Sequence, residues 1–266
     1  MFTLSIPITA SNLDAIKLEL TKGMPEVKSS HRCEAIARGF GFRTYATIRA
    51  ALANGASTEA AADGAAFTAY LADHDFAVSA IPFYRVVARR ALEGVMERVP
   101  KLTLWGIGVG EPRRKADGRW ETGRELHAKF VDERADLLSD YTIEPFLASL
   151  AFVSRIERTR TVRPKTNSYW LKHIAENYAC TYPEGQALGP QYVANGVLIA
   201  AAVHAGFDIH TRVEESGYDS VNATFNMAHT SLVNLDCEIR PDGARAQERR
   251  DRAEMRARPG LRSSYL

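Results

Sequence analysis

The stretch from Tyr192 to Phe207 is the most apolar part of the chain, and it constrains the fold more than any other segment. A helix that is apolar on nearly every side must be surrounded by other protein elements. Asn195, Gly196 and His204 interrupt the stretch, which is too short to span a bilayer. We therefore expect a central buried helix over about residues 191–205 and no membrane partner.

Periodic apolar patterns predict helices elsewhere. From Ile81 to Pro100 they recur at three- and four-residue spacing, and Pro82 suits the first turn of a helix. Residues 29–55 read as two short helices joined by a glycine turn, the outline of a helix-turn-helix. Further helices are expected from Ser57 or Thr58 and through Val221–Leu232. The predicted class is mainly α with one or two small β-hairpins, an α+β arrangement.

One of these hairpins is expected after residue 100. Leu102–Val109 has the composition of a strand, and Asp117-Gly118 is a strong turn signal. The chain then divides into an N-terminal helical lobe (1–100), a lobe with the hairpin and the helical core (101–238), and an Arg-rich solvated helix or tail (239–266). The formal net charge is +2, and residues 239–266 hold 8 Arg against 4 acidic residues. The positive balance therefore comes from the tail.

Two segments carry resemblances to known sequences. The run SSHRCEAIARGFGFRTYATIRAAL resembles the glyoxalase-related domain near the start of many plasmid-type bacterial proteins, over about residues 12–52. The matching positions are Ser30, Glu34, Ala37, Gly41, Phe42, Tyr45 and Ile48. These are mainly packing residues, so the resemblance implies no catalytic residue and no metal ligand.

The second resemblance is to uncharacterised plasmid and phage proteins in which Leu-Lys-His precedes Asn-Gly and an alanine-rich helix. The matching residues are Tyr169, Leu171, Lys172, His173, Asn195 and Gly196. This similarity implies a mobile-element setting and supplies no activity.

Basic residues on the expected loops and on the helix-turn-helix segment favour contact with nucleic-acid phosphates. The candidate residues are Arg43, Arg49, Arg113, Arg114, Lys115, Arg119, Arg158, Arg160, Arg163 and Lys165, with Trp120 as a side chain that stacks on a base. The first hypothesis is thus a non-catalytic, nucleic-acid-associated accessory protein of mobile-element type, binding DNA or RNA through basic loops and the tail.

Two alternatives stay open. His173 and Glu176 are three residues apart on one helical face, and a glutamate that orients a histidine makes a general base. With the polar Asn195 in the apolar helix, they define a hydrolase-like pocket. Against this stands a solvated face with a Lys172–Glu176 pair, and close helix packing at Asn195-Gly196. The other alternative is an inhibitor or regulator that binds another protein.

No cofactor or metal is expected. The Gly106, Gly108, Gly110 series lacks the third glycine of a dinucleotide fingerprint, and the chain has neither HExxH nor CxxC. Its three cysteines are far apart, which suits a reducing compartment. The beginning of the chain has no signal-peptide pattern. We expect a cytoplasmic protein.

Overall fold

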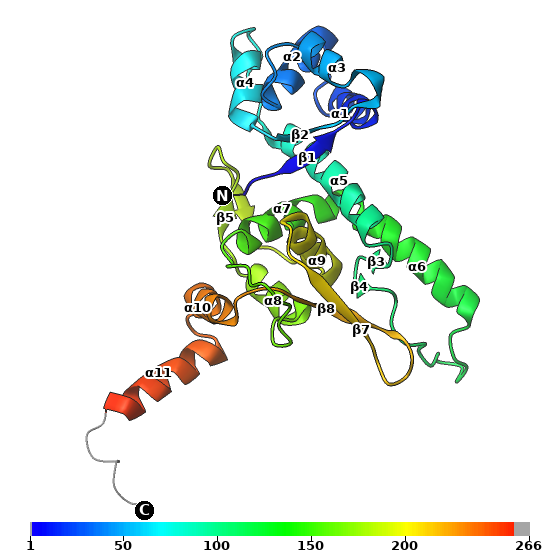
Figure 1. Ribbon diagram of the computed structural model, residues 1–266, viewed down its shortest axis with the longest axis vertical. Helices are drawn as coiled ribbons and strands as arrows, with labels where there is room; N and C mark the ends of the chain where they lie inside the picture. The colour runs from blue at the N-terminus through cyan, green and yellow to red at the C-terminus, as the bar shows by residue number, and fades with distance from the viewer. Residues whose placement is uncertain (1, 258–266) are drawn as a thin grey trace, which may run out of the picture.

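The computed structural model describes residues 2–257, which form an upper N-terminal lobe, a larger lower lobe and a projecting C-terminal helix (Figure 1). The upper lobe contains β1 (Ser5–Ile8), α1 (Ala10–Gly23), α2 (Ser29–Gly39), α3 (Tyr45–Ala51), the 3-10 helix η1 (Ala53–Gly55), β2 (Thr58–Ala61) and α4 (Gly64–Ala72). The long helix α5 (Ile81–Arg98) packs against α1 and α4 above and against α7 and α9 below. It therefore joins the two lobes.

The lower lobe holds the remaining elements. They are β3 (Leu102–Thr103), β4 (Gly106–Ile107), α6 (Gly123–Leu137), α7 (Asp140–Val153), α8 (Ser168–Ala175), β5 (Cys180–Thr181), β6 (Ala187–Gly189), α9 (Asn195–His204), β7 (Ile209–Val213), β8 (Asp219–Phe225) and α10 (His229–Ile239). The solvated helix predicted near the C-terminus is α11 (Ala244–Ala257), whereas the tail from residue 258 lies outside the described residues. Within residues 2–257 the strands pair as four two-stranded antiparallel sheets, which confirms the mainly α class with small hairpins.

The predicted central helix is α9. Every residue from Asn195 to Val203 is buried, and α9 packs against α5, α7 and α8. Its neighbour α7 is likewise buried over most of its length. Among the described residues, no helix combines the length and apolar character needed to cross a bilayer.

The first turn of α9 lies directly against the turn between β3 and β4. The amide of Gly196 donates to the Leu104 carbonyl at 2.9 Å, and an added Cβ at Gly196 would lie 1.8 Å from the Thr103 carbonyl oxygen. The single strand expected over Leu102–Val109 is therefore wrong. The segment reverses after Thr103, and Gly106 (φ +135°) lets its backbone approach the Val221 carbonyl.

Two expected helices begin later than predicted, because a strand takes their first residues. The helix predicted from Ser57 or Thr58 is present as α4, but its predicted start is wrong: Thr58–Ala61 pairs with β1, and the helix begins only at Gly64, capped by Asp63. Pairing with the edge of β1 outweighs the helix propensity of alanine.

The helix predicted through Val221–Leu232 is wrong in its first half, where β8 pairs with β7. Val221 and Phe225 are four residues apart, a spacing that fits both a helix and one face of a strand.

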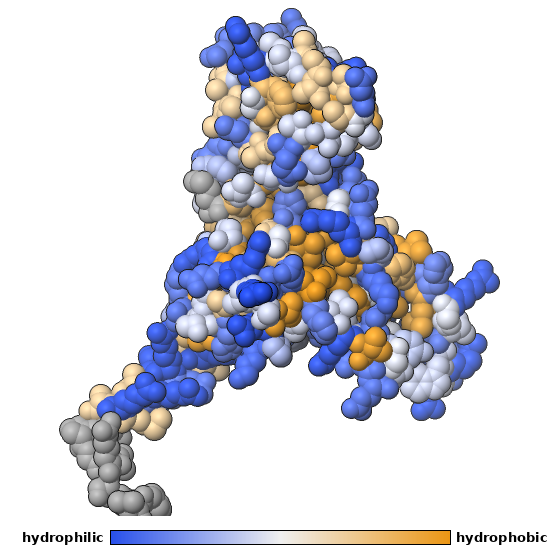
Figure 2. All heavy atoms as spheres, in the orientation of Figure 1, coloured by the Kyte–Doolittle hydropathy of each residue, from blue (hydrophilic) through white to orange (hydrophobic). Residues whose placement is uncertain are grey.

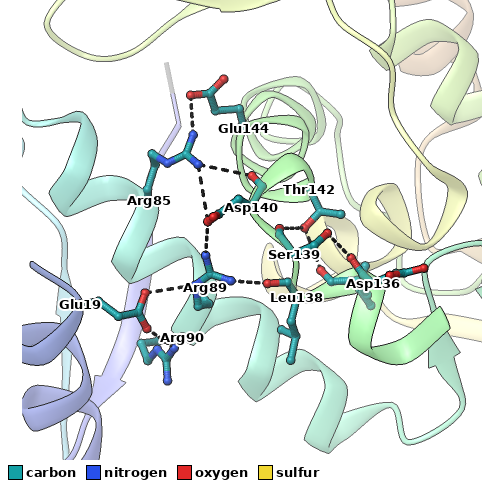
Figure 3. Close-up of polar contacts among 11 residues, drawn as sticks. Glu19, Arg85, Arg89, Arg90, Asp136, Leu138, Ser139, Asp140, Thr142 and Glu144 are labelled. Atoms are coloured by element: carbon teal, nitrogen blue, oxygen red, sulfur yellow. Dashed lines mark hydrogen bonds and ion pairs between the residues drawn. The ribbon is translucent and has the colours of Figure 1, made fainter. Parts of the chain in front are cut away.

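Ion pairs on α5 tie the lobes together (Figure 3). Arg89 donates to Glu19 of α1 at 3.1 Å, to Asp140 of α7 at 2.5 Å and to the Leu138 carbonyl. Arg90 shares Glu19 at 2.5 Å. Because Arg89 keeps only 20% of its side chain exposed, these bonds fix the position of α1 over the lower lobe more firmly than surface pairs would.

Two helical glycines give a matched test of the packing at α9. Gly196→Ala forces a methyl group into the Thr103 carbonyl, so we expect a loss of about 3 kcal/mol in the free energy of unfolding. Gly94→Ala on α5 meets nothing within 4 Å and is expected to stabilise by about 0.5–1 kcal/mol. Urea unfolding followed by circular dichroism measures both. A Gly196→Ala protein as stable as the wild type would contradict the close contact.

Candidate nucleic-acid interface

The start of α8 is fixed to β8 by side-chain hydrogen bonds. The Asn167 carboxamide caps the helix by accepting from the Trp170 amide at 2.9 Å. The Ser168 hydroxyl accepts from the Ala223 amide at 3.1 Å, and the Thr166 hydroxyl donates to the Phe225 carbonyl at 2.7 Å. The N-terminal end of α8 is thereby held beside the β7–β8 hairpin.

A cleft of about 340 Å³ opens between these elements. We call it the α8 cleft; it is lined by Pro164, Asn167, Tyr169, His210, Arg212, Ser220, Asn222, Ala223 and Thr224. Tyr169 is 55% exposed, so one aromatic ring is available to solvent at the edge of the cleft. The rest of the cleft lining includes side-chain hydroxyls, amides, an imidazole and a guanidinium. The N-terminus of α8, which carries a partial positive charge, also borders the cleft through its cap residue Asn167.

The basic connector reaches this cleft with only some of its cations. Arg163 and Lys165 flank the lining residue Pro164, and both are exposed. Arg160 is also exposed on the connector. Arg158 points elsewhere: it donates to the Ala205 carbonyl at 2.9 Å, and its guanidinium lies 5.3 Å from the Phe207 ring centre. Arg158 therefore serves packing at the end of α9.

The loop that carries the other predicted cations lies between β4 and α6. Arg114 and Trp120 form an isolated antiparallel bridge, and Gly118 (φ +82°) supplies the predicted turn. Arg119 pairs with Asp117 at 2.7 Å. Lys115 pairs with Glu125, and Arg114 donates to the Gly118 carbonyl. The cations of this loop are thus largely engaged within the loop and the start of α6.

Two further residues complete this region. Trp120 is 64% exposed, and Arg113 is exposed at the start of the loop. The cavity beside the loop is lined by Gly110 on one side and by Tyr218 of the β7–β8 turn on the other. The loop therefore neighbours the same hairpin that forms one wall of the α8 cleft.

The remaining basic candidates are further from this hairpin. Arg43 and Arg49 are exposed beside α3, in the upper lobe. The two helices of the predicted helix-turn-helix are present as α2 and α3. On α11, Arg245 lies 4.1 Å from the Trp170 ring centre and 3.4 Å from the Asp236 carboxylate, so this arginine docks the helix onto the lower lobe.

The outer ridge of α8 brings together His173 and Glu176. The His173 Nδ1 lies 2.8 Å from Glu176 Oε2, and Lys172 Nζ lies 2.7 Å from Glu176 Oε1. The expectation that Lys172 points outward is wrong: it is 7% exposed and also donates to the Val193 carbonyl. Burial opposes ionisation of Glu176, but hydrogen bonds from Lys172 and His173 outweigh it and lower the pKa of this carboxyl.

Asn195, the third residue of the predicted pocket, faces a different neighbourhood. Its Nδ2 donates to the carbonyls of Val221 at 3.0 Å and Trp105 at 3.2 Å, and lies 3.2 Å from the Asn222 side-chain oxygen. Asn195 Oδ1 is buried and has no hydrogen-bond partner among the described residues. The amide thus joins three chain segments and has no contact with the His173–Glu176 pair.

A second, apolar pocket of about 100 Å³ lies beside Trp105. We call it the aromatic pocket; it is lined by Leu104, Trp105, Tyr141, Thr142, Pro145, Tyr192, Ala194 and Val197. Three of these are large side chains with roughly half or more of their surface exposed: Trp105 47%, Tyr141 60% and Tyr192 61%. Exposed rings around one concave site are unusual for a surface that binds nothing.

Most residues of the α8 cleft and of the aromatic pocket are not among the candidates predicted from the sequence. His210 and Arg212 are two positions apart on a strand, so a period of two puts both on one face. This spacing in the sequence could have identified His210 and Arg212 as neighbours. By contrast, Trp105, Tyr141 and Tyr192 come from three distant segments, and only the fold places them around one pocket.

A large concave feature lies between the lobes. Two cavities of about 640 and 530 Å³ share Ser5, Glu59 and His204, and we call them the inter-lobe groove. Figure 2 shows apolar side chains gathered between the lobes, in the region of α7 and α9. Burial lowers the pKa of His204 to about 4, so its imidazole is neutral at neutral pH.

Within residues 2–257, no cluster of three or more His, Cys, Asp or Glu side chains could hold a metal ion. Comparisons of the chain with known protein families, with curated proteins and with solved structures find no match.

The histidine in the inter-lobe groove makes stability depend on pH. The unfolded chain binds a proton near pH 6.5, whereas the folded His204 does so only near pH 4. The contribution of neutral His204 to the free energy of unfolding is therefore complete above pH 6.5. It is lost as the pH falls towards 4, by about 3 kcal/mol in all. Between pH 7 and pH 4.5, urea unfolding should show a smaller decrease in the free energy of unfolding for His204→Gln than for the wild type. Equal decreases would mean that folded His204 takes up a proton freely.

Proposed function

We propose that the protein is a nucleic-acid-binding accessory protein whose principal contact surface is the α8 cleft with its flanking connector. The α8 cleft is the observation that carries the proposal: an exposed aromatic ring, Tyr169, stands beside Arg212, His210 and polar amides. Aromatic rings stack on bases, while cations and helix N-termini meet phosphates. Such a binder needs no cofactor.

Free cations favour the connector over Lys115 and Arg119 of the β4–α6 loop. Arg160, Arg163 and Lys165 are exposed and form no ion pair with a described residue. Arg119 and Lys115 of the β4–α6 loop already have acidic partners, which a phosphate would have to replace. Because releasing an ion pair costs part of the gain from a new one, the unpaired connector cations are the better phosphate contacts.

Binding should depend on salt and on the connector. We expect the full-length protein to bind a fluorescein-labelled oligonucleotide at low salt, and the double variant Arg163→Ala/Lys165→Ala to bind it about tenfold more weakly. The slope of log Kd against log salt should fall by about 2, roughly one for each phosphate contact removed. Fluorescence anisotropy over a salt series measures both quantities.

The matched control removes the same charge from the upper lobe. Arg43→Ala/Arg49→Ala takes two exposed cations from beside α3 and should leave the affinity and the salt slope near those of the wild type. A larger loss in this control would place the contact surface on the helix-turn-helix segment. Absence of binding to every DNA and RNA strand at low salt would end the proposal.

A second candidate function rests on the contact between His173 and Glu176. A half-exposed imidazole hydrogen-bonded at 2.8 Å to a carboxylate of lowered pKa is the arrangement of an oriented general base. Its reaction class would be hydrolysis, with water as the nucleophile. Asn195 takes no part, because its side chain is committed to the β3–β4 turn and β8.

The hydrolase alternative predicts activity that depends on this histidine. His173→Ala should lower kcat/KM on a responsive ester or phosphodiester by roughly 10²–10⁴-fold, since general-base catalysis contributes about that factor. Glu176→Gln should lower it less and shift the pH profile. His127→Ala, which changes an exposed histidine on α6, is the control. If the wild-type protein hydrolyses none of a broad substrate panel, the hydrolase alternative is eliminated.

A further inference from the structure

We propose that the nucleic acid is single-stranded, and that the aromatic pocket of Trp105, Tyr141 and Tyr192 holds an unpaired base next to the one that stacks on Tyr169. This inference rests on the proposed function and adds the class of strand and a second binding site. It starts from the fact that three exposed rings, contributed by the β3–β4 turn, α7 and the segment before α9, line one pocket.

Two independent contacts make the aromatic pocket a neighbour of the α8 cleft. The Lys172 ammonium lies 5.9 Å from the centre of the Tyr169 ring, which lines the cleft, and 5.0 Å from that of Tyr192, which lines the pocket. The second contact is Asn195, whose Nδ2 lies 3.2 Å from both the Trp105 carbonyl and the Asn222 side chain. Trp105 belongs to the pocket and Asn222 to the cleft.

The floor of the aromatic pocket favours a flat, largely apolar group. Leu104, Pro145, Ala194 and Val197 supply apolar surface, with Thr142 as a polar neighbour. A nucleobase has apolar faces and can stack on any of the three rings, whatever its identity. The pocket therefore supports binding with little sequence preference.

The neighbouring cations favour a nucleic-acid occupant over an apolar peptide. The cleft contributes Arg212, which pairs with Glu214 at 3.1 Å, and the exposed Arg163 and Lys165 flank it. A strand that places one base on Tyr169 and another in the aromatic pocket would lead its phosphates past these side chains. An uncharged peptide gains nothing from them.

A single strand fits this arrangement better than a duplex. Bases in a duplex are stacked and paired, so their faces cannot reach exposed rings unless the helix is opened. Unpaired bases offer both faces to aromatic side chains and follow an uneven surface. The exposed rings of the aromatic pocket and of Tyr169 thus favour an unpaired strand.

The experiment compares four probes of equal length with the full-length protein at one low salt concentration. They are a mixed-sequence DNA strand, the same sequence as RNA, its DNA duplex, and an abasic DNA strand that keeps every phosphate but no base. We expect the DNA or the RNA strand to bind at least tenfold more tightly than both the duplex and the abasic strand. The comparison of DNA with RNA identifies which sugar the surface prefers.

Variants of the pocket test the second site. Tyr192→Ala and Trp105→Ala should each weaken single-strand binding roughly 5- to 150-fold, the range for losing one base–aromatic stack. Tyr192→Phe keeps the ring and should restore the affinity. Tyr218→Ala, an exposed tyrosine in the β7–β8 turn outside both sites, should leave it unchanged. Circular dichroism verifies that each variant is folded.

The outcomes separate this inference from the proposed function. If no probe binds, the proposed function itself fails. If all probes bind alike and Arg163→Ala/Lys165→Ala weakens them all, the protein binds phosphates only, and the single-strand inference is overturned while the function stands. If bases matter but Tyr192→Ala and Trp105→Ala have no effect, the aromatic pocket has another occupant, such as an apolar side chain of a protein partner, and the second site is overturned.

Discussion

The contact between the first turn of α9 and the β3–β4 turn governs the lower lobe. Gly196 leaves no room for a side chain beside Thr103, and Gly106 leaves none beside Val221. Buried between them, Asn195 donates to the carbonyls of Trp105 and Val221. A buried helix end needs partners for its free amides, and here the Leu104 carbonyl accepts from Gly196. One small cluster thus gives the Gly196 amide a partner and aligns three segments.

The two sites on the surface above follow from this contact. Because the β3–β4 turn is held against α9, Trp105 projects beside Tyr192 and closes the aromatic pocket. Because β8 is held by the same amide, Asn222 lies at the edge of the α8 cleft. Lys172 then fills the space between Tyr169 and Tyr192 and is neutralised by Glu176. At Asn195-Gly196 the structure thus fits the explanation by close helix packing, since Gly196 lies against Thr103 and Asn195 is bonded to Trp105 and Val221.

Local patterns predicted the core better than they predicted the surface. The central helix was expected over 191–205 and is Asn195–His204, because an apolar stretch with only three interruptions allows no other placement. The segments 102–109 and 221–225 were misassigned, since both owe their conformation to partners far along the chain: α9 for one and β7 for the other. Of the candidate site, Arg163 and Lys165 could be predicted from charge alone. The aromatic pocket could not, because its rings meet only after folding.

The charge balance of the chain sets how such a surface can bind. With a net charge of +2 and many cations already paired, the protein has little long-range attraction for a polyanion. In the complex we propose, stacking on Tyr169, Tyr192 and Trp105 supplies most of the affinity, and the few unpaired cations orient the strand. Each stack is worth about 1–3 kcal/mol. The surface we propose would therefore discriminate by whether bases are exposed, without reading their sequence.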